Sequence, residues 1–146
     1  MNMNARNIVL TTLLCIVTIF SILGCGDTSS NEKTNKKISY TNVDINVLMN
    51  DLEINAASAS KKYKGKYVRI TNGRITNIDS DGDYFTLEPL TENLTLASVH
   101  CSIESKKIKK QLLSLRNGER IIVYGHITDV GDIIGYSLDT QKIETP

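Results

Sequence analysis

Residues 61–69 carry five positive charges around two tyrosines, Tyr63 and Tyr67. Proteins that hold single-stranded nucleic acid combine such charge with rings on which bases stack. The same lysines also suit an ordinary helix end, where cations interact favourably with the helix dipole. We favour the helix end, because 17 basic residues face 16 acidic ones in the whole chain and leave little excess charge. The candidate basic patch comprises Lys61, Lys62, Lys64 and Lys66.

The segment Asp79-Ser80-Asp81-Gly82-Asp83 has alternate carboxylates, which supply the oxygen ligands that calcium prefers. It departs from the calcium-binding loop of EF-hands, because its glycine directly follows the second aspartate and Leu90 occupies the twelfth position. Aspartate and glycine are also typical of a hairpin turn. We therefore expect a turn here and no metal site.

The two histidines, His100 and His126, have no third ligand at a spacing that would complete a zinc site. No serine, cysteine or aspartate stands in a nucleophile motif, and the sequence has no glycine-rich phosphate loop. Catalysis would need a pocket that gathers both histidines with a carboxylate. We expect no enzymatic activity, no catalytic residue and no cofactor.

In several segments of the chain, polar and apolar residues alternate, as in strands with one buried face. In the longest such segment, residues 67–78, Val68 and Ile70 share one phase and Ile75 has the opposite one. A one-residue slip at Gly73 is typical of a β-bulge that bends the strand, so a side chain there should strain the backbone. Further strands are expected at residues 84–88, 94–103, 120–128 and 133–140.

Apolar residues at three- and four-residue spacing predict a helix from Ile45, capped by Asp44, to about Gly65. A second, short amphipathic helix is expected over residues 104–115. Three strands, a helix and two strands follow one another as in the OB fold. We predict a mainly β fold, a five-stranded OB-fold Greek-key barrel with an N-terminal helix and a short helix between strands 3 and 4. The alternatives are another small Greek-key barrel or an open sheet.

OB barrels bind ligands with the faces of their second and third strands and the neighbouring loops. In this chain the loop around residues 90–94 borders those strands. Outward positions on these strands, with others on the first and fourth, form the candidate ligand-binding face: Tyr67, Arg69, Tyr84, Thr86, His100, Ser102 and Tyr124.

The first residues of the chain have the pattern of a secretory signal, with a charge at Arg6, an apolar run over residues 8–23 and a small residue, Gly24, before Cys25. Ile22-Leu23-Gly24-Cys25 resembles the lipobox of bacterial lipoproteins, which implies cleavage before Cys25 and a diacylglycerol on its sulfur. The alternative is an uncleaved membrane anchor, since the run approaches the ~17-residue minimum for a spanning helix. We favour the lipobox, because a simple anchor does not need a small residue and a cysteine at its end.

The signal and the composition divide the chain into three parts. Residues 1–24 are the signal peptide, residues 25–43 are the lipidated cysteine and a flexible tether, and residues 44–146 are the OB-fold domain. The tether is expected because this segment is polar and has too few apolar residues to offset the entropy of ordering.

Several short motifs between residues 45 and 143 together carry a family resemblance. Asn55-Ala56 on the leading helix precedes the turn Tyr63-Lys64-Gly65-Lys66, and further matches are Tyr84-Phe85-Thr86-Leu87, Val99-His100-Cys101, Gly118-Glu119-Arg120-Ile121 and Val123-Tyr124-Gly125. Together they resemble the tRNA-anticodon-like OB-fold family of small bacterial envelope proteins, many of which follow a lipoprotein signal. The resemblance implies the fold and an envelope setting, but no shared catalytic residue or ligand.

These observations favour a lipid-anchored, non-enzymatic binding or adaptor module of the bacterial cell envelope. The expected partners are the membrane, through the N-terminal lipid, and then an envelope protein, an oligosaccharide or a nucleic-acid strand, in falling order. The alternative function is an envelope-associated single-stranded nucleic-acid binding protein. We expect the protein at the bacterial cell membrane. Gly26, in place of aspartate, permits sorting to the outer membrane in an organism with two membranes.

Replacing Cys25 by serine should abolish lipidation, because serine lacks the sulfur that accepts the lipid. Labelled palmitate should be incorporated into the wild type and not into Cys25→Ser. Cys101→Ser is the control, since Cys101 shares an apolar face with Val99 and Ile103 and should be a buried, inert thiol. Label on Cys25→Ser would contradict the lipobox.

Overall fold

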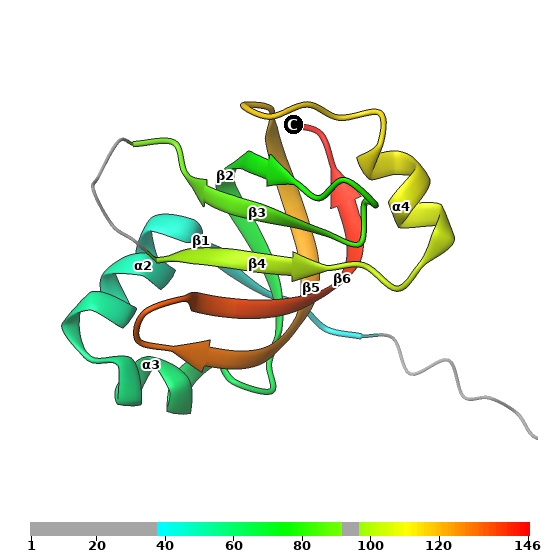
Figure 1. Ribbon diagram of the computed structural model, residues 1–146. Coiled ribbons are helices and arrows are strands. Elements are labelled where there is room, and N and C mark those ends of the chain that lie inside the picture. Colours follow the sequence, from blue (N-terminus) through cyan, green and yellow to red (C-terminus); the bar gives the residue numbers. More distant parts are fainter. Residues whose placement is uncertain (1–37, 92–96) are drawn as a thin grey trace, which may run out of the picture. The chain divides into compact units, whose positions relative to one another are not determined.

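The computed structural model describes residues 38–91 and 97–146 (Figure 1). The predicted signal, Cys25 and the tether as far as residue 37 lie outside the described residues, as does residue 92 onward of the loop near residues 90–94. No helix among the described residues has the length and hydropathy needed to cross a membrane. The elements are β1 (Thr41–Asp44), α2 (Ile45–Ile54), α3 (Ala56–Tyr63), β2 (Tyr67–Ile78), β3 (Tyr84–Pro89), β4 (Ser98–Ser102), α4 (Lys106–Leu112), β5 (Arg120–Gly131) and β6 (Gly135–Glu144).

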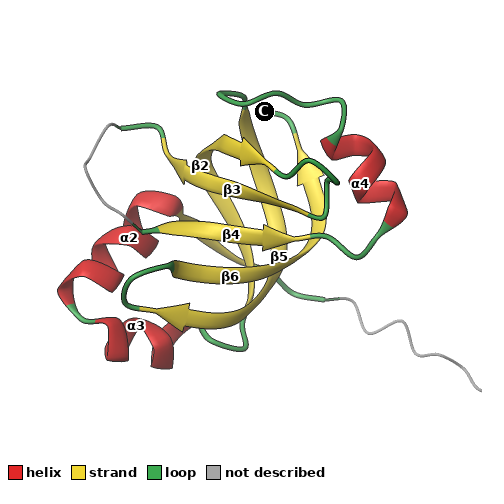
Figure 2. Cartoon of the chain, in the orientation of Figure 1, coloured by secondary structure: helices red, strands yellow, loops and turns green. Residues whose placement is uncertain are grey.

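Strands β2 to β6 form a closed five-stranded barrel, which confirms the predicted mainly β OB fold. Their order is β2-β3-β4-β6-β5, and β5 returns to pair with β2. The pairing of β4 with β6 is parallel, and the other four barrel pairings are antiparallel. Helices α2 and α3 lie at one end of the barrel and α4 lies at the other (Figure 2).

Alternate residues of each strand point into one core, because each strand has a buried and a half-buried phase. Helix α2 adds Ile45 and Leu48, which are fully buried, and α4 adds Leu112. The hydroxyl of Tyr136 is a polar group within this packing, and it donates to the carbonyl of Leu48 at 2.8 Å. That bond joins β6 to α2 and satisfies a group that would otherwise be costly to bury.

The predicted slip of phase in β2 is present. Ile70 lies opposite Val123 and Gly73 lies opposite Ile121, so one extra residue is inserted in β2. The positive φ of this bulge, 59°, falls on Asn72 and not on Gly73. The expected backbone strain at Gly73 is therefore wrong: glycine is needed because a Cβ there would lie 2.6 Å from the side chain of Leu87.

Two boundaries near the start of the domain differ from the prediction. The single N-terminal helix is two helices, because Asn55 adopts an extended conformation and its side chain accepts a hydrogen bond from the Ser58 N–H at 3.0 Å. The range 25–43 assigned to the tether includes most of β1, which pairs in parallel with Val68–Thr71 of β2. The folded domain therefore begins before residue 44.

Gly73→Ala should lower the free energy of unfolding by about 1–3 kcal/mol, because its methyl group overlaps Leu87, which is fully buried. Gly131→Ala is the matched control: its φ is not positive and the nearest atom to its Cβ is 3.9 Å away. This variant should stay within about 0.5 kcal/mol of the wild type. Urea unfolding measures both, and equal stability of the two variants would contradict the close contact.

Candidate ligand-binding face

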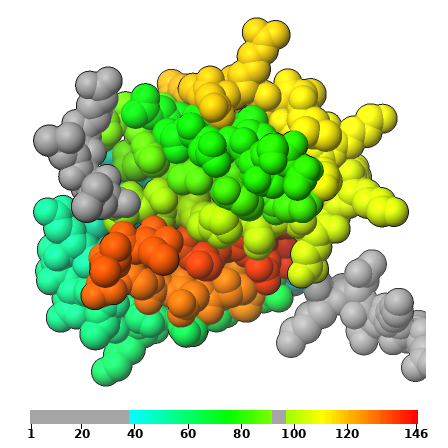
Figure 3. Space-filling view, viewed as in Figure 1, coloured from blue at the N-terminus to red at the C-terminus, as the bar shows by residue number. Residues whose placement is uncertain are grey.

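One row of side chains follows the outside of the barrel across all five strands. The strand register places Tyr84 opposite Ser102, Ser102 opposite Asp139, Asp139 opposite His126, and His126 opposite Tyr67. Neighbouring strands are about 4.8 Å apart, so the row extends for roughly 19 Å along the sheet. Strands β3, β4 and β6 lie on the side of the barrel that faces the viewer in Figure 3. We call this row of side chains the outer row.

Aromatic pairs stand at both ends of the outer row. The rings of Tyr84 and His100 have their centroids 4.6 Å apart, and those of Tyr67 and His126 are 4.8 Å apart, both with tilted planes. Between them the row is polar, since the Ser102 hydroxyl donates to the Asp139 carboxylate at 3.0 Å. The arrangement therefore offers two stacking surfaces with hydrogen-bonding groups between them.

Beside the Tyr67 end, Arg69 and Tyr124 form a rigid network. Arg69 Nε donates to the Tyr124 hydroxyl at 2.8 Å, and that hydroxyl donates to Glu144 Oε2 at 2.7 Å. Lys142 Nζ lies 4.9 Å from the centre of the Tyr124 ring and pairs with Glu144. Hydrogen bonds from Lys142 and Tyr124 hold the pKa of Glu144 below its usual value.

Tyr40 covers part of this network from the residue before β1. Its ring packs edge-on against Tyr124 at 5.2 Å and against Tyr67 at 6.1 Å between centroids. Its hydroxyl donates to Gln141 Oε1 at 2.6 Å, and burial raises its pKa. Tyr40 was not predicted to belong to this face, because residues 25–43 were assigned to the tether. An aromatic side chain in an otherwise polar segment was the signal that could have found it.

The candidate face divides into two groups on the outside of the barrel. The first group lies on β2 and β5, and the second lies on β3 and β4; they are Tyr67, Arg69 and Tyr124, and Tyr84, Thr86, His100 and Ser102. His126 and Asp139 connect the two groups and were not assigned to the face from the sequence. Whether this face binds a ligand stays a prediction.

Two of the four lysines of the candidate basic patch form ion pairs with carboxylates. Lys62 pairs with Asp51 at 2.8 Å and Lys64 pairs with Asp129 at 2.6 Å. Of the four lysines of the patch, Lys61 and Lys66 have no ion-pair partner within the described ranges. The hydrogen bonds to Asp51 and Tyr63 raise the pKa of Lys62.

Tyr63 cannot serve as a stacking surface, because only 5% of it is exposed. Its ring packs against Tyr136 at 5.8 Å, and its hydroxyl donates to Asp51 Oδ2 at 2.6 Å. The end of α3 is thus packed on the barrel, as the interpretation of this segment as a helix end requires.

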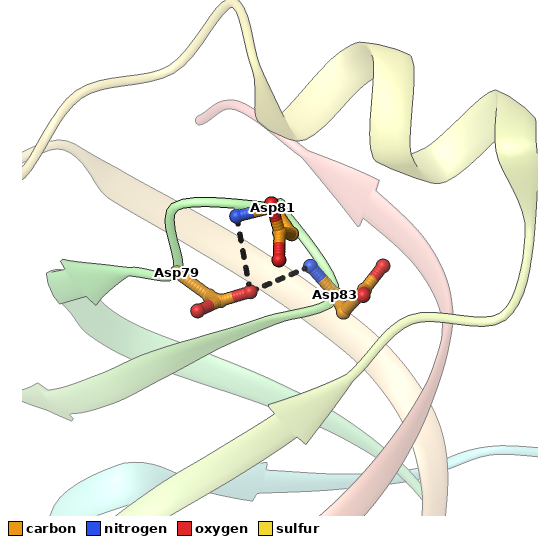
Figure 4. A group of neighbouring side chains, drawn as sticks. All are labelled: Asp79, Asp81 and Asp83. Atoms are coloured by element: carbon orange, nitrogen blue, oxygen red, sulfur yellow. Dashed lines mark hydrogen bonds between the residues drawn. The ribbon is translucent and has the colours of Figure 1, made fainter.

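The acidic segment between β2 and β3 is a hairpin turn (Figure 4). Carboxylate oxygens of Asp79, Asp81 and Asp83 lie within 4.8 Å of one another, close enough to hold a cation. Asp79 Oδ2, however, accepts from the backbone N–H of Asp81 at 3.2 Å and of Asp83 at 3.4 Å. Lys109 pairs with Asp83 at 2.6 Å and offsets its charge. These contacts are those of a turn, in which aspartate bonds to the backbone ahead of it.

The outer row contains the residue types of a hydrolytic triad in an order unsuited to that chemistry. In a triad, histidine contacts the serine and takes its proton, and the carboxylate orients the histidine. Here Asp139 lies between Ser102 and His126, so the serine hydroxyl donates to the carboxylate. The two histidines also stack on different tyrosines. The geometry favours binding over nucleophilic catalysis.

Comparison with known families agrees with this geometry. The family model described as tRNA_anti-like matches residues 1–137, which is most of the chain. The chain therefore belongs to this family, and the resemblance found in its sequence is confirmed. No curated protein matches the chain. OB folds of this kind are binding domains, which supports the coarse assignment of a binding module.

Tyr124→Phe should raise the pKa of Glu144 toward its ordinary value, because the variant removes one of the two side-chain hydrogen bonds that lower it. The depressed pKa implies a contribution to stability that is present above the unfolded-state pKa. That contribution is lost as the pH falls through the folded-state pKa. An NMR titration of the carboxyl carbon measures the shift. Tyr84→Phe on β3, whose ring packs on His100, is the control, and an unchanged Glu144 titration in Tyr124→Phe would contradict the network.

Proposed function

We propose that this member of the tRNA_anti-like family is a lipid-anchored, non-enzymatic binding or adaptor module of the bacterial cell envelope. The observation that carries the binding role is the outer row, which spans every strand of the barrel and has an aromatic pair at each end. The anchor is supported by the lipobox-like Ile22-Leu23-Gly24-Cys25.

The face is suited to binding because its side chains are already held in place. Tyr124 is fixed by hydrogen bonds with Arg69 and Glu144, and Tyr40 by its bond to Gln141. A ring that is fixed before binding loses little rotamer freedom when a ligand arrives. The closed barrel fixes the spacing of the strands in the same way.

The charges of the face favour a protein segment or an oligosaccharide over a nucleic-acid strand. Asp139 stands in the middle of the outer row, and Glu144 lies beside Tyr124. These carboxylates offset Arg69 and Lys142 and would repel a phosphate backbone. Tyrosine and histidine rings with nearby hydroxyls and carboxylates suit sugar rings and peptide side chains, which carry both apolar faces and hydrogen-bonding groups.

The lipid would place this face outside the cytoplasm, at the bacterial cell membrane. In an organism with two membranes, Gly26 after the lipidated cysteine permits the outer membrane. A partner in the envelope, protein before oligosaccharide, follows from this location and from the mixed charge of the face.

A photo-reactive amino acid at Thr86, which lies opposite His100 and two residues from Tyr84 on the candidate face, should form discrete adducts in intact cells. The same amino acid at Glu53, which is exposed on α2, is the matched control and should form none of them. Sensitivity of the adducts to protease or glycosidase identifies the class of partner.

Identical adducts from both positions, or none from Thr86, would refute the β3 and β4 part of the candidate face as the binding surface. Adducts removed by nuclease alone would instead support the alternative, an envelope-associated single-stranded nucleic-acid binding protein. Comparing the adducts of the Thr86 and Glu53 variants, expressed in the same host strain, distinguishes these outcomes.

A further inference from the structure

Two arginines stand directly opposite each other on the outside of the barrel. Arg74 of β2 pairs in register with Arg120 of β5, and their neighbours Gly73 and Ile121 are buried. Both arginines therefore project outward, and directly opposite residues on one face have Cβ atoms about 5 Å apart. Like charges in this position destabilise a sheet.

The two guanidinium groups have no acceptor among the residues that the structure describes. None of the side-chain hydrogen bonds or ion pairs there involves Arg74 or Arg120. Glu88 lies opposite Arg74 on β3 but forms no ion pair with it. The Nε atom of Arg74 is itself buried without a partner. A buried donor that lacks an acceptor costs free energy. An anion beside the two guanidinium groups would offset their opposed charges.

A hollow of about 160 Å³ lies beside Arg120, and Arg74 does not line it. This volume is several times the roughly 30 Å³ that one water molecule occupies in the liquid, so a small anion fits. The bulge forms one side of it, with Asn72 at its positive φ, and Arg120 and Ile122 form another.

We propose that Arg74 and Arg120 bind a phosphate group. Each guanidinium presents a planar fork of N–H donors that matches the oxygens of a phosphate bidentately. Two forks side by side can share one tetrahedral group with several oxygens, whereas a carboxylate has only two oxygens to offer. The ligand is a free phosphate or one phosphate of a larger molecule.

This site is separate from the outer row and does not depend on the proposed function. Arg74 lies beyond the bulge, on the part of β2 that pairs with β3, whereas Tyr67 and Arg69 lie before it. Asp139 does not lie opposite either arginine, whereas Glu88 lies opposite Arg74 and Glu144 lies opposite Ile122, two residues from Arg120.

Calorimetric titration of the full chain with inorganic phosphate tests the proposal. Saturable binding is expected, and Arg74→Gln and Arg120→Gln should each weaken it about tenfold or more, because each removes a charged fork. Arg74→Lys keeps the charge but loses the fork, and should also bind more weakly. Lys61→Gln removes the same charge on α3 and should bind as the wild type does.

Thermal unfolding provides a second readout that does not depend on the titration. Phosphate should raise the Tm of the wild type and of Lys61→Gln, and should have little effect on either glutamine variant. Without phosphate, Arg120→Gln should be at least as stable as the wild type, because the opposed charges are removed. This comparison also shows that the variant folds.

Two further probes distinguish the source and the class of anion. A short thymidine oligonucleotide that binds more tightly than phosphate, with the same dependence on both arginines, would identify a nucleic-acid phosphate as the source. Acetate that binds as tightly as phosphate would overturn the assignment to phosphate. Absent saturation, or equal weakening in Lys61→Gln, would overturn the site itself.

Discussion

The structure depends on one strand that pairs with two partners at once. Strand β2 pairs with β5 along residues 67–70 and with β3 along residues 73–78. Gly73 and Arg74 pair with both partners. The strand can do this only because it bulges at Asn72 and because Gly73 has no side chain to meet Leu87. The pairing of β2 with β5 closes the barrel. Because of this closure, each of the five barrel strands pairs with a neighbour on both of its edges.

Closure also decides what lies on the outside. Because β6 inserts between β4 and β5, side chains from distant parts of the chain become neighbours in one row. The same bulge separates this row from the arginine pair further along β2. One geometric constraint thus produces two surfaces of different charge: a mixed aromatic face, and a cationic position without an acceptor.

Much of the fold was predictable because its signals are local. Alternation located β2 and β3, and the phase slip located the bulge within one residue. The division of the leading helix at Asn55 was missed because helical spacing continues across it, and only the cap geometry reveals the break. Strand β1 was missed because a short polar segment acquires its strand from pairing with β2, and not from its own composition.

The candidate face shows where sequence reasoning stops. Alternation determined which residues point outward, among them Tyr67, Tyr84 and His100, since that property follows from the two-residue period of a strand. Only the tertiary structure decided that Asp139 and His126 join them and that Arg74 faces Arg120. Those neighbours are set by strand order and register, which depend on how the whole barrel closes. The sequence by itself therefore determined which side chains of each strand point outward. Barrel closure decided which of those outward side chains become neighbours.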